Sequence, residues 1–95
     1  MTVNRRVLQR LLAEVERFEL GEVSLPDLQR AILGHGLAVE LGQQWQDLVN
    51  HVEGAIEMAR FTVAPAAQRD AIRPHLDRLR ASARQAIDAE PDEAE

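Results

Sequence analysis

The sequence predicts an all-α fold, a single compact antiparallel bundle of about four helices. Apolar residues recur at spacings of three and four along most of the chain, and no stretch shows the alternation that is typical of strands. The length of 95 residues suffices for one small hydrophobic core and is too short for two. We expect helices over roughly residues 4–20, 25–33, 38–61 and 66–88, in one domain over residues 1–88 followed by a flexible acidic tail over residues 89–95.

The first predicted helix has one apolar face and a clear end. Gly21 stands where a residue in the left-handed conformation commonly ends a helix. Ser24, Pro26 and Asp27 then supply a capping hydroxyl, an early proline and an acid in the first turn. The second helix is therefore expected to begin at Leu25. The apolar face of the first helix consists of Val7, Leu8, Leu11, Leu12, Val15 and Phe18.

Two glycines predict the end of the second helix. In Gly34-His35-Gly36, two residues of high backbone freedom stand within three positions, which favours a turn. The second helix is thus expected to end at Leu33 and the third to start near Ala38. Trp45 lies in the middle of the third apolar face, so we expect it in the core with its indole N–H near the rim. That face consists of Leu41, Trp45, Leu48, Val49, Val52, Ile56 and Ala59.

The fourth predicted helix contains a proline. Pro74 has no amide hydrogen and crowds the preceding turn. We therefore expect either a kink at Pro74, or a break in which residues 66–72 form a separate turn and the main helix starts near Arg73. The apolar face of this helix consists of Ile72, Leu76, Leu79, Ala83 and Ile87.

Composition excludes several classes of protein. The chain has no cysteine, which excludes disulfides, thiolate metal sites and cysteine nucleophiles. The longest apolar runs, such as Leu11 to Ala13, have three residues, too few for a membrane-spanning helix or a secretory signal, so a cytoplasmic location is expected. The formal net charge of −5 disfavours a general nucleic-acid binder and favours a protein partner with a cationic surface.

Charge is segregated along the chain. Residues 1–10 sum to +3, residues 11–59 to −7, residues 60–84 to +4 and residues 85–95 to −5. An acidic set, which we define as Glu14, Glu16, Glu19, Glu22 and Asp27, is either a plain charged surface or a face that complements a cationic partner. An arginine stripe lies beside the fourth apolar face; it is either solvated, paired with acids of the first helix, or a binding surface for an acidic partner or a phosphate backbone. The stripe consists of Arg69, Arg73, Arg80 and Arg84.

Met58 and Phe61 leave two alternatives open. If the third helix ends near Ala59, Phe61 folds back and closes the core. If the helix continues, Met58 and Phe61 form, with Val63, an apolar patch that anchors a partner or a second copy of the chain.

Signals for chemistry are weak. Glu40, Asp47 and His51 share one strip of the third helix, but two carboxylates and one imidazole rarely make a metal site, so we predict neither a metal nor a cofactor. His-Glu-x-x-His, glycine-rich phosphate loops and Gly-x-Ser-x-Gly are all absent from the sequence. A small bundle also rarely offers a recessed polar pocket. No catalytic residue is assigned, and the chain is not expected to be an enzyme.

Residues 18–28 resemble a segment of small acidic helical bacterial proteins that include the colicin-type immunity proteins. Their sequence is Phe-Glu-Leu-Gly-Glu-Val-Ser-Leu-Pro-Asp-Leu. This resemblance covers 11 of the 95 residues. It implies an inhibitor that covers a toxin's basic active site with acidic helices, and it assigns binding to Glu19, Glu22 and Asp27. The arginine stripe departs from the uniformly acidic surface of such proteins.

The sequence thus predicts a small non-catalytic protein-binding module, in its most concrete form an immunity-like inhibitor. The first alternative is a homo-oligomeric structural or regulatory protein that uses Met58 and Phe61. The second is a nucleic-acid-associated regulator that uses the arginine stripe.

Overall fold

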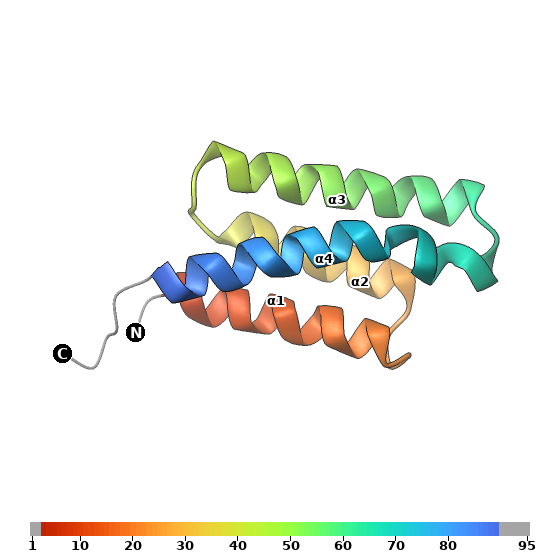
Figure 1. Cartoon of the computed structure of the whole chain (residues 1–95), viewed down its shortest axis with the longest axis horizontal. Helices are drawn as coiled ribbons and strands as arrows, with labels where there is room; N and C mark the ends of the chain where they lie inside the picture. The colour runs from red at the N-terminus through yellow and green to blue at the C-terminus, as the bar shows by residue number, and fades with distance from the viewer. Residues whose placement is uncertain (1–2, 90–95) are drawn as a thin grey trace.

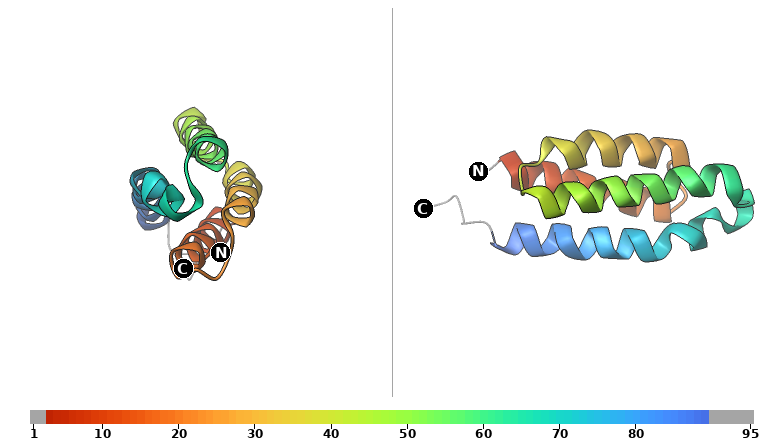
Figure 2. Two further views of the ribbon diagram at one scale, coloured as in Figure 1. Left: turned by 90° about the vertical axis from the view of Figure 1, so that its right-hand side faces the viewer. Right: turned by 90° about the horizontal axis from the view of Figure 1, so that it is seen from above.

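The protein is an antiparallel bundle of four helices. The computed structural model describes residues 3–89, which form α1 (Val3–Glu19), α2 (Leu25–Ala38), α3 (Gln43–Thr62) and α4 (Pro65–Ala89), with no strand among them (Figure 1). Successive helices run in opposite directions, and each packs against two neighbours, so that α4 closes the ring against α1 (Figure 2). The predicted fold class is confirmed.

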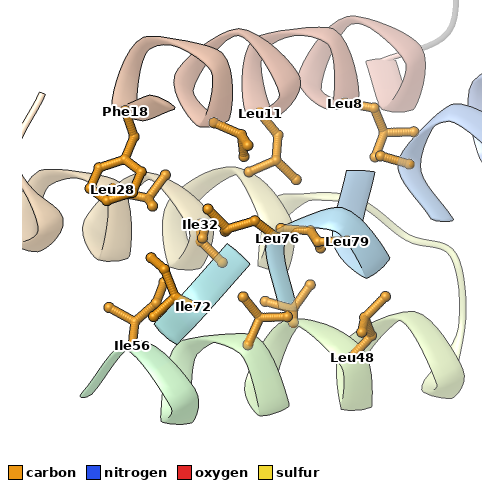
Figure 3. Close-up of a cluster of buried hydrophobic side chains, with 14 of the residues drawn as sticks. Leu8, Leu11, Phe18, Leu28, Ile32, Leu48, Ile56, Ile72, Leu76 and Leu79 are labelled. Carbon is orange, nitrogen blue, oxygen red and sulfur yellow. The ribbon is translucent and has the colours of Figure 1, made fainter. Parts of the chain in front are cut away.

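The predicted apolar faces meet in one core. Leucine, isoleucine and valine side chains from all four helices interdigitate there (Figure 3). Trp45 is 5% exposed, and its Nε1 donates a hydrogen bond of 2.8 Å to the carbonyl oxygen of Gly36. The indole is therefore a core residue, as expected, but its N–H is satisfied by a buried backbone carbonyl rather than at the rim. The largest fully buried side chains are Leu8, Leu11, Val15, Leu28, Ile32, Val39, Val49, Val52, Ile56, Ile72, Leu76 and Leu79.

The corner between α1 and α2 is formed by local residues. Gly21 has a φ of 79°, and its N–H donates to the carbonyl oxygen of Phe18 at 3.0 Å, while the N–H of Glu22 donates to that of Arg17 at 2.8 Å. This pair of bonds is a Schellman motif. Ser24 Oγ accepts a hydrogen bond of 3.2 Å from the N–H of Asp27 and caps α2. The predicted helix stop and helix start are both confirmed.

The glycine turn predicted at residues 34–36 is wrong. α2 continues through both glycines to Ala38, and the chain turns over residues 39–42, where Gly42 has a φ of 94°. The expected start of the third helix near Ala38 is therefore also wrong, because α3 begins at Gln43. Gly36 lies instead where α2 approaches α3. A Cβ at this position would lie 2.8 Å from Val49 Cγ1 and 2.9 Å from Val49 Cγ2. Gly36 therefore permits close packing of two helices rather than reversal of the chain.

Pro74 does not break the fourth helix. α4 runs without interruption from Pro65 to Ala89 with Pro74 inside it, so the separate turn over residues 66–72 is absent. The first turns of α4 tilt away from the axis of the remainder (Figure 1). A proline that removes one backbone hydrogen bond and crowds the preceding turn accounts for this bend.

A hydrogen bond joins the start of α1 to the end of α4. Arg5 Nη2 of α1 donates a hydrogen bond of 3.0 Å to the carbonyl oxygen of Ile87 in α4.

The acidic tail was predicted over residues 89–95. Ala89 is the last residue of α4, and residues 90–95 lie outside the described part of the chain. Within residues 3–89, no helix combines the length and the apolar character needed to cross a bilayer.

Candidate functional site

Arg80 of the arginine stripe is held by two acids. Its Nη2 bonds to Glu19 Oε1 at the end of α1, and its Nη1 donates to Asp77 Oδ1 at 2.9 Å. The side chain of Arg80 is 22% exposed. The hydrogen bond to Glu19 raises the pKa of the Arg80 guanidinium, although burial acts in the opposite direction. Arg80 is thus an internal tie between α1 and α4.

The other members of the stripe differ in their surroundings. Arg69 lies over the ring of Phe18, with 5.6 Å between the guanidinium carbon and the ring centre. Arg73 pairs with Asp70 at 3.0 Å on the surface of α4. Arg84 has no ion-pair partner within residues 3–89 and lines a groove between α1 and α4. The stripe is therefore largely occupied by contacts within the chain.

The acidic set is also mostly paired. Glu14 and Glu22 lie 3.0 and 3.6 Å from Arg17, and Asp27 lies 3.3 Å from Arg30. Glu19 is bound by Arg80, which leaves Glu16 as the member without a partner in the described part of the chain. Residues 3–89 hold all 11 arginines and 12 of the 16 carboxylates, a formal charge of −1. The described bundle is close to neutral.

A polar network that the apolar spacing did not predict joins α2 to α3. Gln29 is 7% exposed, and its Nε2 donates to Glu53 Oε1 at 2.8 Å and to Glu57 Oε2 at 3.3 Å. Arg60 Nη1 donates to Gln29 Oε1 at 2.7 Å. The signal in the sequence was a glutamine directly after Leu28 on an apolar face, with two glutamates one helical turn apart on the next long helix.

The strip expected from Glu40, Asp47 and His51 on the third helix is not assembled. Glu40 lies in the turn before α3 rather than on the helix, and its backbone N–H donates to Asn4 Oδ1. Asp47 Oδ1 accepts a hydrogen bond of 2.8 Å from Gln43 Nε2. No group of three or more potential metal-ligating acids and histidines exists within residues 3–89. Glu40, Asp47 and His51 therefore do not form one site.

Met58 and Phe61 lie on the surface. α3 continues to Thr62, so Phe61 does not fold back to close the core, and the second of the two alternatives describes its position. Phe61 is 74% exposed and Met58 is 64% exposed, while Val63 is half-buried against the core. The guanidinium of Arg60 lies 5.5 Å from the centre of the Phe61 ring.

A mostly apolar groove lies between α3 and α4, with Met58 in its lining and Phe61 three positions further along α3. Its volume is about 520 Å³, and its two helices contribute small or apolar residues along most of its length. His51 and His75 lie together in its lining, with 5.3 Å between ring centres. We call this groove together with Met58 and Phe61 the α3–α4 face. The groove is lined by Asn50, His51, Gly54, Ala55, Met58, Ala59, Val63, Ala71 and His75.

Comparisons with protein-family models, with curated proteins and with solved structures gave no match to this chain. The resemblance of residues 18–28 to immunity proteins therefore stays a prediction. The four-helix arrangement and the surfaces that it presents are the basis for any functional conclusion.

Proposed function

We propose that this chain is a non-catalytic protein-binding module and that the α3–α4 face is its binding surface. The observation that carries the proposal is the exposure of two large apolar side chains on α3: Met58, which is 64% exposed and lines a mostly apolar groove, and Phe61, which is 74% exposed three positions further along the helix. Clustered exposed apolar residues on a small domain are typical of a surface that another protein covers. Complete burial of one such side chain stabilises a complex by about 1.5–3 kcal/mol.

A second copy of the chain is the partner that this face fits best. The face carries protruding side chains, Met58 and Phe61, and a hollow next to them. A two-fold contact brings the same patch of both copies together, so a patch with both features complements itself.

A cationic partner on the acidic set has less support. Four of the five acids are already paired with arginines of the same chain, so a partner would have to displace these contacts. The same argument weakens nucleic-acid binding by the arginine stripe, in which Arg73 and Arg80 are ion-paired. The immunity-like role and the nucleic-acid role therefore rank below self-association.

The proposal is tested by light scattering of the purified chain, from micromolar to near-millimolar concentration. We expect the mass to rise toward twice that of the chain. Phe61→Ser should shift the dimerisation midpoint to at least tenfold higher concentration. Leu20→Ser is the matched control, because Leu20 is 66% exposed outside the α3–α4 face, and it should dimerise like the wild type. A wild-type chain that stays monomeric throughout, or a Phe61→Ser variant that dimerises normally, would refute self-association through this face.

A further inference from the structure

Two histidines from different helices lie next to each other in the α3–α4 groove. His51 belongs to α3 and His75 to α4, and their ring centres are 5.3 Å apart with the planes tilted by 59°. His51 is exposed and His75 is half-buried. Within residues 3–89, neither ring has a hydrogen-bond or ion-pair partner. The imidazole nitrogens therefore form no hydrogen bond or ion pair with the rest of the described chain.

The separation of the rings suits a shared tetrahedral ion. An ion bonded to one nitrogen of each ring lies roughly 3.2 Å from each ring centre, which is a zinc–nitrogen bond of about 2.0–2.1 Å plus roughly 1.1 Å within the ring. At a tetrahedral angle, two such ring centres are roughly 5.2 Å apart. The observed separation is 5.3 Å.

We propose that His51 and His75 of one chain bind one Zn²⁺ ion, with water in the remaining coordination positions. Imidazole nitrogen suits zinc and related transition metals, whereas Mg²⁺ and Ca²⁺ prefer oxygen ligands. The two charged side chains that line the adjoining groove with His51 are Asp47 and Arg78, which are opposite in sign. The site links α3 to α4, so the bound ion stabilises the contact between these two helices.

Calorimetric titration with zinc chloride at neutral pH, in a buffer without chelating groups, tests the proposal. We expect one ion per chain and no binding of Mg²⁺. His51→Gln and His75→Gln should each weaken zinc binding at least tenfold. The matched control is His35→Gln, because His35 lies on α2, outside the groove, and this variant should bind zinc like the wild type. Absence of zinc binding, or an equal loss in His35→Gln, would overturn the assignment.

A measurement on the wild-type chain makes the test independent of how the variants fold. In imidazole nitrogen NMR spectra, zinc should shift the signals of His51 and His75 and leave those of His35 in place. Unchanged His51 and His75 signals would contradict the proposal.

The zinc-binding proposal and the self-association proposal can be refuted independently of each other. Phe61→Ser keeps both histidines, so this variant should still bind one zinc ion per chain whether or not the wild type dimerises. A stoichiometry of one ion per two chains would contradict a site formed within a single chain.

Discussion

Arg80 in α4 bonds to Glu19 at the end of α1 and so joins the last helix to the first across 61 positions of the sequence. Asp77, one turn before Arg80, shares the same guanidinium. This tie lies at the junction of the acidic set and the arginine stripe. The other paired acids of the acidic set bind Arg17 and Arg30, which lie outside the stripe.

Arg80→Gln should destabilise the fold by about 1–2 kcal/mol, because the half-buried Glu19 carboxylate loses its partner. The matched control is Arg73→Gln, whose pair with Asp70 is exposed and contributes less than about 0.5 kcal/mol. Urea unfolding of both variants measures the difference. The pKa of Arg80 is raised, so its contribution is present at neutral pH and is lost as pH rises through the folded pKa of the guanidinium. Equal losses in the two variants would contradict the tie.

Gly36→Ala and Gly34→Ala should change stability in opposite directions. Both glycines lie inside α2, where alanine is favoured by about 1 kcal/mol. A Cβ at Gly36 would lie 2.8 Å from Val49 Cγ1, so Gly36→Ala should destabilise the fold by about 1–3 kcal/mol. A Cβ at Gly34 would have no neighbour within 4 Å, so Gly34→Ala should raise the melting temperature. Thermal unfolding of both variants tests this, and shifts of the same sign would contradict the packing described for Gly36.

Gln29→Ala should destabilise the fold by about 1–3 kcal/mol, because Glu53 and Glu57 lose a shared donor and Arg60 loses an acceptor in a partly buried network. Gln46→Ala is the control, since Gln46 is exposed on α3. It should stay within about 0.5 kcal/mol of the wild type. Chemical denaturation followed by the fluorescence of Trp45 compares the two. A Gln29 variant as stable as the control would show that the network adds nothing.

Glu16→Lys and Glu19→Lys separate surface charge from stability. Glu16 has no partner within residues 3–89, so its reversal should leave the unfolding free energy within about 0.5 kcal/mol. Glu19→Lys places a cation beside Arg80 and should destabilise the fold by more than about 1 kcal/mol. Urea unfolding distinguishes them. A loss of partner binding in Glu19→Lys therefore has to be compared with the binding of Glu16→Lys, which changes the charge without changing the stability. Equal unfolding free energies of the two variants would contradict the pairing of Glu19 with Arg80.

The sequence was sufficient for features that depend on neighbours along the chain. Apolar spacing predicted the buried faces of α1, α3 and α4. Gly21 and Ser24 predicted the corner between α1 and α2, because stop and cap signals act within one turn. Gly36 was misassigned since a glycine serves equally in a turn or at a close helix contact. Only Val49, on another helix, decides between them.

The candidate sites depend on contacts between helices. His51 and His75 belong to different helices, and their closeness is set by how α3 and α4 align. The exposure of Phe61 depended on whether α3 ended before or after this residue. Helix boundaries are the least accurate part of a prediction from apolar periodicity. Pairing of the arginine stripe with acids of the first helix was one of the stated alternatives, and Arg80 with Glu19 is such a pair. Which arginine pairs, and the partners of Gln29, could not be predicted, because periodicity identifies a face without saying which residue lies opposite.

The order of the helices around the bundle also has a kinetic consequence. Three of the four helix–helix contacts join consecutive helices, and only the contact between α1 and α4 closes a long loop. Folding rates rise when native contacts are local in sequence. The chain should therefore fold within microseconds to milliseconds, with the pairing of α1 and α4 as the step that costs most chain entropy.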